Sequence, residues 1–546
     1  MRKHIHFLIW TVFFLPFTTL DAQSFQWAAQ YGDTSGESLK GLTSDASGNL
    51  YLCGNFSENI QIGTNQLTAD YEEDMYLIST DNQGQSLWGE SVSSPENIDI
   101  GGLAIHDDAL YVVAQYWGTA IFEDSISLSP TQGSGSAFFL LKYSTAGQFI
   151  WTKSIDGNGL KKVEDIHTDH EGNVYLTGYF GKQLFTEMND LIAEGNTNFF
   201  ILKYTPDGEL LWAKSAGDAG DIRARSVATD EQGGVYVSGN FEGDMTFAGE
   251  LIESNGLDND IFLLKYDEAG NEIWLREIRG VFEDAANDMA VDENGNIYLT
   301  GAFSGVLRLG DVEFNTIGFN DDVFIAKYNF NGDFFWAKTF AGSGFGSGES
   351  LILDGEKIYL GGEFRGESIF GSTSLTSDEI RPDIFIMAMD TSGTFEWVKQ
   401  GGSMEVDLLE QLTLLPDGRL VAGGSFNQYT HFNHIQLTAK GGYDAYLFAL
   451  HPLLIHTTNT FTETDVNVFP VPARDMFFVK INNHFRGNCR GNILDNTGKI
   501  IQTFSWYKSQ LEQTFFVPMK DLPIGVYIFT LECKGNFWYE KITITN

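Results

Sequence analysis

Seven tryptophans recur at a nearly constant interval, and this repeat restricts the possible folds more than any other feature of the sequence. The intervals are 61, 63, 61, 62, 62 and 61 residues, between Trp27, Trp88, Trp151, Trp212, Trp274, Trp336 and Trp397. A second marker, an apolar run such as GNVYLTGYF or GNIYLTGAF, recurs at the same spacing. A period of this length indicates that one structural unit is repeated along the chain.

Each repeat contains four short runs that we interpret as β-strands. In the copy around residue 300 these runs are MAVD, NIYLTGAF, DVFIAKY and FFWAKTF. Turn signals of the type Asp-x-x-Gly separate the first run from the second and the third from the fourth, and Gly supplies the positive φ of tight hairpins. Runs that are apolar on both faces fit strands covered by neighbouring sheets. The sequence therefore predicts an all-β fold, a seven-bladed β-propeller of four-stranded blades.

The two ends of the repeat region complement each other. The last copy stops near Leu450 without a Trp-bearing strand, whereas Trp27 stands at the start without the three strands that precede it elsewhere. We expect the first strand of the chain to pair with the last three strands, which would remove the open edges of the array. These repeats, from about residue 24 to 451, resemble the β-propeller repeat proteins of secreted bacterial chains. The resemblance implies the fold and not the function.

The composition excludes one class of partner. The chain has 546 residues, 42% of them hydrophobic, and a net charge of −41, so it can form a sizeable core but would repel a nucleic acid. The charge is uneven. Residues 23 to 465 contain 22 Lys and Arg against 67 Asp and Glu, whereas residues 466 to 546 contain nine against six. We therefore divide the chain into residues 1–22, the propeller 23–455, a Thr-rich linker 456–465 and a C-terminal domain 466–546.

The N-terminus predicts a secretory signal peptide over residues 1–22. Arg2 and Lys3 precede an apolar run from Ile5 to about Phe17, and Ala22 provides a small residue at the cleavage site. The alternative is a membrane anchor, but the apolar run is shorter than the roughly 18–20 residues that cross a bilayer, and no later stretch is long enough. We expect a soluble mature chain that begins near Gln23.

The C-terminal domain reads as a small antiparallel sandwich of the Ig-like kind. Its order of motifs resembles the type A sorting domain of the type IX secretion system of Bacteroidetes, although Val471 stands where that family usually has Asn. The resemblance implies export through the periplasm and across the outer membrane, with the secretion machinery as a partner, to the cell surface or the medium. The matching residues to which we assign the sorting signal are Phe469, Pro470, Pro472, Gly525, Tyr527 and Lys541.

Three cysteines are too few for a disulfide framework. Cys489 and Cys533 could pair or remain free, and the sequence leaves both possibilities open. Cys53 stands where other repeats have Thr177, Ser238 and Thr300, which predicts a small buried side chain.

No catalytic or metal-binding constellation is recognisable in the sequence. The His-x-x-His pairs at 167 and 170 and at 431 and 434 do not lie in a helix, so we interpret them as structural. The segment DENGNIY, residues 292–298, has oxygen ligands at alternate positions like a calcium loop, but it lacks the Gly and bidentate Glu of a full loop. We interpret it as a turn and expect no cofactor.

A ligand-binding surface is predicted on the face that carries the long, variable connections, because function on a fixed scaffold usually resides in such segments. Trp117 beside Tyr116 could stack on a sugar or peptide or simply pack at the rim, and Arg365 could contact a ligand or form a surface ion pair. The candidate ligand-binding residues are Tyr116, Trp117, Glu242, Arg365 and Asn427.

Two functions remain open at this point. The first is a non-catalytic secreted or surface-displayed binding or adhesion module for a glycan or protein. The alternative is an extracellular lyase or hydrolase that acts on polysaccharide in the central funnel. A cluster of His, Tyr, Arg and acidic residues from several repeats would favour the enzyme, and the sequence shows only scattered candidates.

Overall fold

The computed structural model describes residues 25–544 without 63–64, 123–125, 132–134, 219, 255–258, 317–319, 434, 451–465, 470–475, 483–485, 495–499, 520–521, 524 and 534–535. The predicted signal peptide and Thr-rich linker, together with Pro470 and Pro472, lie outside the described residues. One compact unit comprises Phe25–Leu450, and the second contains the C-terminal domain. All regular secondary structure in the described residues is β-strand, so the protein is all-β, as predicted.

The first complete repeat shows the recurring unit. Strands β2 (Glu37–Ser44), β3 (Leu50–Phe56), β6 (Asp74–Thr80) and β7 (Ser86–Ser93) pair in this order, each antiparallel to the next. β3 and β6 are buried along their whole length. β2 alternates in part between buried and partly exposed residues, whereas β7 is buried only at its last two residues. The two central strands are apolar on both faces because each sheet packs against its neighbours.

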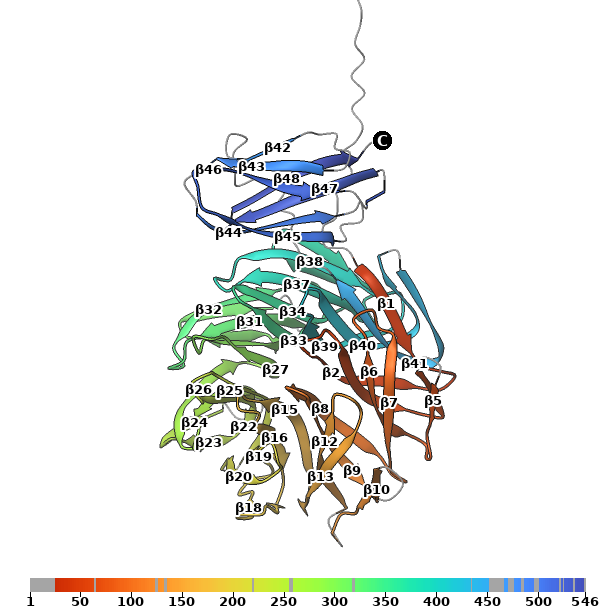
Figure 1. Ribbon diagram of the computed structural model, residues 1–546. Helices are drawn as coiled ribbons and strands as arrows, with labels where there is room; N and C mark the ends of the chain where they lie inside the picture. The colour runs from red at the N-terminus through yellow and green to blue at the C-terminus, as the bar shows by residue number, and fades with distance from the viewer. Residues whose placement is uncertain are drawn as a thin grey trace, which may run out of the picture. The chain divides into compact units, whose positions relative to one another are not determined.

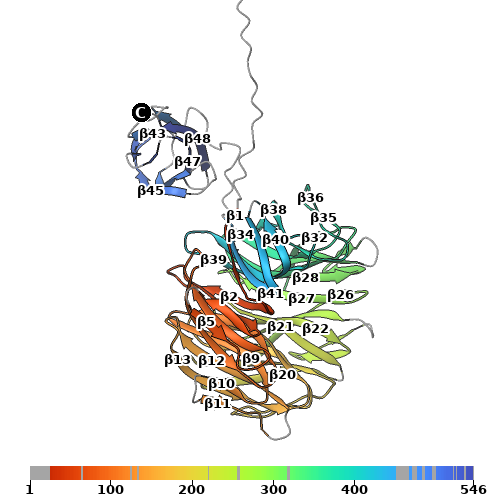
Figure 2. The same ribbon diagram turned by 90° about the vertical axis from the view of Figure 1, so that its right-hand side faces the viewer.

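The same order of four strands recurs along the chain, and Figures 1 and 2 show the sheets fanned around a common centre. The further sets are β8 (Ile98–His106), β9 (Ala109–Trp117), β12 (Ser136–Ser144) and β13 (Phe149–Ile155); β15 (Lys161–Thr168), β16 (Val174–Phe180), β19 (Asn198–Tyr204) and β20 (Leu210–Ala216); β21 (Asp221–Thr229), β22 (Val235–Glu242), β25 (Asp260–Tyr266) and β26 (Glu272–Gly280); β27 (Asp284–Val291), β28 (Ile297–Ser304), β31 (Asp321–Tyr328) and β32 (Phe334–Phe340); and β33 (Gly346–Asp354), β34 (Lys357–Phe364), β37 (Asp383–Asp390) and β38 (Phe395–Gly401).

The sheet that joins the two ends of the repeat region confirms the predicted pairing. β39 (Asp407–Leu414), β40 (Leu420–Phe432) and β41 (Ile435–Leu450) are completed by β1 (Phe25–Tyr31), which lies antiparallel to β41 with Trp27 opposite Ala449. In Figure 1 the red β1 lies beside the blue β41. The first strands of the sheets also touch in sequence, β2 with β8, then β15, β21, β27, β33 and β39, and β39 contacts β2. The arrangement is propeller-like, and these first strands enclose a central channel.

The repeated Trp side chains explain the period of the sequence. Trp212 packs on Gly270, which lies in the turn between the third and fourth strands of the next sheet, and its Nε1 donates a hydrogen bond of 3.1 Å to the Glu268 carbonyl. Trp27 packs in the same way on Gly84, so the N-terminal strand makes the contact that the repeat requires. Each of these glycines has a positive φ, and a Cβ at this position would meet the indole ring.

The C-terminal unit is built from two antiparallel sheets. One contains β42 (Val466–Phe469), β43 (Met476–Asn482) and β46 (Glu512–Pro518), and the other contains β45 (Ile500–Lys508), β44 (Gly487–Leu494), β47 (Gly525–Cys533) and β48 (Asn536–Ile544). Side chains from both sheets form one hydrophobic core, which includes Phe477, Phe529 and Trp538. Cys489 and Cys533 face each other on β44 and β47 and form a disulfide. Cys53 in the repeat unit is unpaired and fully buried, as predicted.

Candidate functional site

Tyr116, a predicted ligand-binding residue, lies in the core. Its side chain is fully buried, and its ring centroid is 5.8 Å from that of Phe139. Its hydroxyl is 3.0 Å from the Ser154 Oγ, so it joins β9 to β13. In this position Tyr116 presents no surface to a ligand and serves packing.

The other predicted residues occupy equivalent places at the end of the second strand of four different sheets. Trp117 ends β9, Glu242 ends β22, Arg365 follows β34, and Asn427 lies in β40. Glu242 is exposed and the other three are partly exposed. The Arg365 guanidinium lies 4.9 Å over the Phe345 ring. The structure therefore distributes these side chains around the ring of sheets instead of gathering them at one point.

The variable connections between the second and third strands of the sheets contain short hairpins, which we call the insert hairpins. They are β4 (Asn59–Ile62) with β5 (Asn65–Thr68), β10 (Ala120–Phe122) with β11 (Ile126–Leu128), β17 (Gln183–Leu184) with β18 (Leu191–Ile192), β23 (Asp244–Phe247) with β24 (Glu250–Glu253), β29 (Val306–Leu309) with β30 (Val312–Asn315), β35 (Glu367–Phe370) with β36 (Thr373–Thr376), and the distal parts of β40 and β41.

The insert hairpins also hold neighbouring sheets together. β10 pairs with β7 and β29 pairs with β26, so each of these hairpins extends the preceding sheet. Each insert hairpin buries at least one apolar side chain; among these are Ile60, Phe122, Leu184, Phe247, Leu309, Phe370 and Phe432. Part of the apparent variability is therefore constrained by packing.

A second group of functional candidates lies in the central channel, where each first strand contains a β-bulge. In β2 the register against β3 slips between Leu39 and Gly41, which leaves Lys40 outside the ladder. In the other first strands the register against the second strand slips at the equivalent place. We call the residues left out the bulge ring: Lys40, Gly101, Glu164, Arg225, Asn287, Glu349 and Glu410. All of them line one cavity of about 350 Å³.

The bulge ring and its neighbours form ion pairs between adjacent sheets. Lys40 Nζ lies 2.8 Å from Glu410 Oε1. Glu164 lies between two cations, 3.3 Å from Lys162 Nζ and 3.8 Å from an Arg225 terminal nitrogen. Lys162 also approaches the Asp99 carboxylate at 3.9 Å. Charged side chains from several sheets thus converge in the channel, a feature that the sequence did not reveal.

Acidic groups dominate one side of this channel, where Glu349 and Glu410 line the cavity and Glu363 lies on the adjoining strand β34. The Asn287 Nδ2 donates to both Glu349 oxygens at 3.4 and 3.5 Å, and the Leu409 N–H donates to Glu363 at 3.3 Å. Burial raises the pKa of Glu363 to about 8, and the nearby charges of Glu349 and Glu410 add to the shift. Burial also raises the pKa of Glu349. A carboxyl group with a pKa of about 8, like that of Glu363, can hold or release a proton near neutral pH.

In several sheets the residue that follows the bulge forms a hydrogen bond to the neighbouring first strand. The Val227 N–H donates to Asp165 at 2.8 Å, and the Leu351 N–H donates to Asp288 at 2.7 Å. Burial raises the pKa of Asp165 and of Asp288 to about 7. Because each carboxylate accepts backbone hydrogen bonds from the next sheet, we assign these two residues to the joint between sheets.

Further along the channel the lining becomes less charged. Thr43, Ile105, His167, Thr229, Val291, Leu353 and Thr413 line a cavity of about 520 Å³. The His167 Nε2 is 3.1 Å from the Thr229 Oγ1, and burial lowers the pKa of His167 to about 4. The imidazole is therefore neutral at physiological pH, and it belongs to the channel wall.

A signal for the bulge ring does exist in the sequence. Its positions are separated by 61, 63, 61, 62, 62 and 61 residues, the same series as the tryptophans. Six of the seven positions hold a polar or charged residue, as in VEDI and ARSV. A bulge changes the direction of a side chain, so the simple alternation of a strand does not show that these residues face the channel.

The predicted calcium-like segment is explained by its own turn. Asp292 Oδ1 accepts the N–H groups of Asn294 and Asn296, both at 2.9 Å, while Oδ2 accepts the Asn296 side chain at 2.8 Å and the Tyr298 hydroxyl at 3.2 Å. Gly295 has a φ of 75°. Both carboxylate oxygens are therefore used inside the hairpin. Among the described residues no group of three His, Cys, Asp or Glu side chains is arranged to hold a metal ion.

In the C-terminal unit the predicted sorting residues have different surroundings. Phe469 is exposed and stacks on Phe478, with 5.8 Å between ring centroids. Tyr527 is buried, and its hydroxyl donates to the Pro523 carbonyl at 2.9 Å, which holds the turn before β47. Gly525 begins β47, and Lys541 is exposed on β48.

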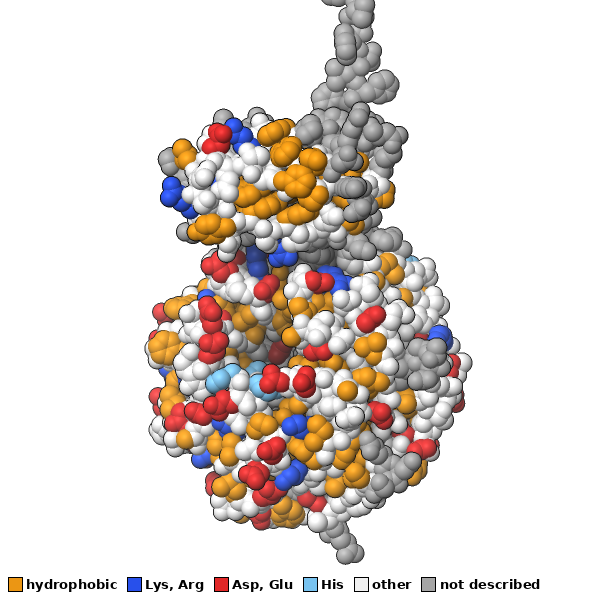
Figure 3. Space-filling model, viewed as in Figure 1, with side chains coloured by type: hydrophobic (Ala, Val, Ile, Leu, Met, Phe, Trp, Pro, Cys, Tyr) orange, Lys and Arg blue, Asp and Glu red, His pale blue; other side chains and the backbone are white. Residues whose placement is uncertain are grey.

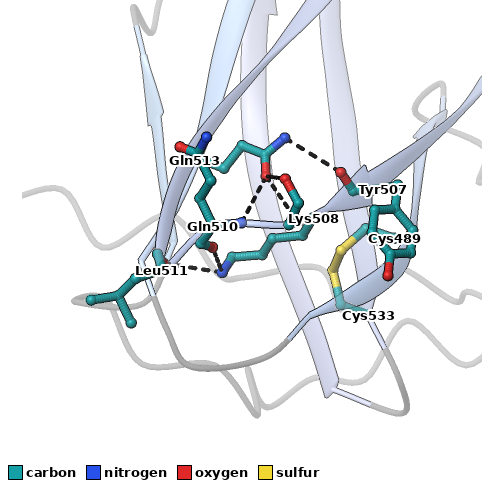
Figure 4. Close-up of a disulfide and its surroundings, with 8 residues drawn as sticks. Cys489, Tyr507, Lys508, Gln510, Leu511, Gln513 and Cys533 are labelled. Carbon is teal, nitrogen blue, oxygen red and sulfur yellow. Dashed lines mark hydrogen bonds between the residues drawn. A yellow bond between two sulfur atoms is a disulfide. The ribbon is translucent and has the colours of Figure 1, made fainter.

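Close to the disulfide, a buried lysine fixes the turn between β45 and β46. The Lys508 Nζ donates to the carbonyls of Gln510 and Leu511 at 2.6 and 3.0 Å (Figure 4). In Figure 3 hydrophobic side chains gather on the visible face of this unit, whereas Asp and Glu side chains are spread over the visible face of the repeat unit. The two units thus differ in surface chemistry, as their charges predict.

Comparison with known proteins agrees with an exported chain of propeller-like repeats. Residues 467–545 match the family model of the secretion system C-terminal sorting domain. This domain marks proteins that type IX secretion exports to the cell surface or the medium, so the chain is an exported protein that interacts with this machinery. No helix in the described part of the chain is long and apolar enough to span a membrane.

The repeats have remote relatives. An uncharacterised WD repeat-containing protein of Acanthamoeba polyphaga mimivirus is 22% identical over 528 residues, which covers 77% of this chain and 38% of that protein. The regulatory protein FlaEY of Caulobacter vibrioides is 25% identical over 269 residues, covering 45% of this chain and 28% of that protein. The chain thus spans less than half the length of these curated relatives.

Among solved structures the similarity is weak. The phage phi92 endosialidase aligns with a TM-score of 0.38 and 8% identity over 82% of this chain and 72% of its own. Sqt1 from Chaetomium thermophilum aligns with a TM-score of 0.37 and 9% identity, covering 84% of this chain and 97% of its own. At these scores neither structure indicates a function.

Proposed function

We propose that the chain is a non-catalytic binding or adhesion protein that acts at the cell surface or in the medium. In this proposal the four-stranded sheets form a seven-bladed β-propeller, and an Ig-like sorting domain directs its export. The observation that carries the proposal is the combination of a sorting domain with a repeat array whose insert hairpins differ in sequence. A fixed scaffold with divergent segments on one face is the usual design of a recognition surface.

The ligand we propose is a glycan or a protein, bound at the face that carries the insert hairpins. Trp117, Glu242, Arg365 and Asn427 lie at the bases of these hairpins or beside them. They supply an aromatic ring, both signs of charge and an amide. Such groups give specificity in small-ligand and protein recognition.

The proposal is tested with the purified full-length chain on a glycan array, in parallel with a screen for polysaccharide degradation. We expect binding without turnover. Trp117→Ala and Arg365→Ala should weaken the bound glycan or protein at least tenfold while changing the unfolding free energy by no more than about 0.5 kcal/mol.

Gly295→Ala serves as the opposite control. Gly295 has a φ of 75°, and an added Cβ would lie 3.0 Å from the Phe330 Cβ. The substitution should cost roughly 1 kcal/mol or more of stability and leave affinity unchanged. Loss of binding in Gly295→Ala at full stability, together with normal binding in the two Ala variants, would show that the ligand binds the opposite face.

A second candidate function is supported by the convergence of charged groups in the channel. An extracellular lyase or hydrolase acting on polysaccharide needs groups that transfer protons near neutral pH. Glu363, with its pKa of about 8, and the neighbouring Glu349 are suitable for this task. Shortening of any polysaccharide by the wild-type chain, abolished by Glu363→Gln, would favour this enzyme over the binding protein.

A further inference from the structure

We propose that the bulge ring is a binding site for one neutral sugar residue. The inference rests on the proposed role in glycan binding. It adds where one sugar residue of the glycan binds and why that residue is uncharged. Three properties of the channel support it: the way in which its side chains are held, the arrangement of donors and acceptors, and the balance of charge.

The side chains of the bulge ring are held in place from several sheets at once. Each bulge lies in a different first strand, and all of these residues line the same cavity of about 350 Å³. Small-molecule sites in proteins typically have volumes of about 300–1,000 Å³. Since bulges redirect side chains and are frequent next to functional sites, the repeated bulge explains how these polar groups reach the channel.

The ion pairs of the bulge ring are not the only joint between the sheets. In three of the sheets the residue after the bulge contributes to this joint, because Asp165, Asp288 and Ser350 accept backbone N–H groups from the neighbouring first strand at 2.7 to 3.0 Å. The bulge ring itself varies between Lys, Gly, Glu, Arg and Asn. A purely structural ring would favour one residue type at equivalent positions, so the variation points to contact with an asymmetric ligand.

Cationic donors and carboxylate acceptors both line the channel, and Glu349 and Glu410 lie across it from Lys162 and Arg225. On β15 and β21, Lys162 and Arg225 share Glu164 at 3.3 and 3.8 Å, and the Arg225 Nε has no hydrogen-bond partner in the described part of the chain. On β33 and β39, which lie across the ring of first strands, Glu349 and Glu410 provide acceptors. A molecule between them must accept hydrogen bonds on one side and donate them on the other. Each hydroxyl of a sugar can do both.

The balance of charge favours a neutral molecule. Most ionic groups of the bulge ring and its neighbours already form pairs, Lys40 with Glu410 and the cations Lys162 and Arg225 with Glu164. Glu349 instead accepts hydrogen bonds from the Asn287 amide, and burial raises its pKa, which favours its neutral form. A charged ligand would have to compete with one of these pairs, whereas a hydroxyl can insert beside them without leaving a charge unpaired. Residues 23–465 contain 67 acidic and 22 basic residues, and this excess of negative charge also repels an anion.

The apolar part of a sugar finds partners in the same cavity. Ile100, Leu103 and Ile166 line it together with the polar groups. A sugar ring presents hydroxyls at its rim and C–H groups on its faces, so a site of this kind combines hydrogen bonding with the burial of apolar surface. We therefore expect the terminal residue of a glycan to enter the channel while the rest of the chain contacts the insert hairpins.

The test measures binding of sugars to the full-length chain by calorimetry. The probes are the methyl glycosides of glucose, galactose, mannose and N-acetylglucosamine, with glucuronate and glucosamine as an anionic and a cationic comparator. At least one neutral glycoside should bind at least tenfold more tightly than either comparator. Arg225→Gln and Glu410→Gln should each reduce its affinity at least tenfold.

Arg308→Gln and Glu313→Gln are the matched controls. Arg308 and Glu313 form an exposed ion pair of 3.1 Å within one insert hairpin, outside the channel, so both substitutions should leave affinity unchanged. If Arg225→Gln or Glu410→Gln lowers the melting temperature, the variant Asn287→Asp is used in place of that variant. This substitution keeps the size of the side chain and adds a negative charge, so we again expect tenfold weaker binding.

Three results would overturn the proposal in distinguishable ways. Tighter binding of glucuronate or glucosamine than of every neutral glycoside would refute the class of ligand. If a glycan found on the array binds normally to the channel variants but not to Trp117→Ala, the channel is not the site and the proposed function stands. If the wild-type chain binds no glycan at all, this inference fails, and the proposed function survives only for a protein ligand.

Discussion

At the scale of single residues, the fold depends on close contacts between an aromatic side chain and a glycine. Gly270 has a φ of 76°, and an added Cβ would lie 3.0 Å from the Trp212 ring. The same contact recurs between the tryptophan of one sheet and a turn of the next, so each glycine satisfies two requirements. It adopts a backbone conformation that other residues rarely adopt, and it leaves room for the indole.

Substitution of Gly270 separates these two requirements. Gly270→Ala should lower the free energy of unfolding by about 2–4 kcal/mol, because the backbone strain and the clash with Trp212 add. Gly249 has the same φ of 76° but nothing within 4 Å of an added Cβ, so Gly249→Ala should cost only about 1 kcal/mol. Denaturant titrations followed by Trp fluorescence measure both values. Equal losses in the two variants would mean that the indole contact has no energetic weight.

At the scale of elements, the N-terminal strand completes the sheet of β39, β40 and β41. The β1 residue Phe25 is buried, and its ring centroid lies 5.1 Å from that of Phe448 and 5.6 Å from that of Phe432. The strand thus contributes both a hydrogen-bonded edge and a part of the core. Without it, β41 would present an open edge to other chains.

We expect Phe25→Ala to destabilise the repeat unit by roughly 3–4 kcal/mol, since the truncation leaves a cavity between aromatic rings. Deletion of residues 23–32 should have a larger effect and should also increase aggregation, which light scattering detects during heating. Leu87→Ala, at an exposed position of β7, is the control and should melt like the wild type. An unchanged melting temperature after the deletion would exclude β1 as the closing strand.

At the scale of the whole molecule, many carboxylates are buried in a chain that is already strongly acidic. Burial raises the pKa of Glu37, Asp322 and Asp407 to about 7 and that of Asp383 and Asp444 to about 6. In the unfolded chain these groups ionise near pH 4. Between these values the folded state binds more protons than the unfolded state, so stability is greatest below about pH 4 for these groups and falls as the pH rises towards 7.

We therefore expect the melting temperature of the repeat unit to be lower at pH 8 than at pH 5. Asp322→Asn provides a specific check. Asp322 is buried, one oxygen accepts the Gly342 N–H at 3.2 Å, and the other has no partner among the described residues. The amide keeps the acceptor and removes the charge, so the variant should gain about 1 kcal/mol or more over the wild type at pH 8 and little at pH 5. An equal effect at both pH values would contradict this account.

Export is the second property of the whole molecule. Residues 25–450 form a compact unit of their own, and the match to the sorting domain lies within 467–545. Deletion of 466–546 should therefore leave a folded repeat unit that accumulates in the periplasm, as cell fractionation and immunoblotting would show. The variant Cys53→Ala, which leaves the sorting domain intact, should be exported at normal levels. Normal amounts of the truncated chain outside the cell would refute a sorting role for this domain.

The sequence alone determined the repeating four-stranded unit, the turns, the pairing of the first strand with the last three, and the C-terminal sorting domain. These features depend on local patterns or on a fixed period, and both are visible along a single chain. The burial of Tyr116, the insert hairpins that join neighbouring sheets, and the bulge ring were decided only in the tertiary structure. The physical reason is that side chains about 61 residues apart meet only when the sheets close around one axis, and that a bulge aims a side chain in a direction that strand alternation does not predict.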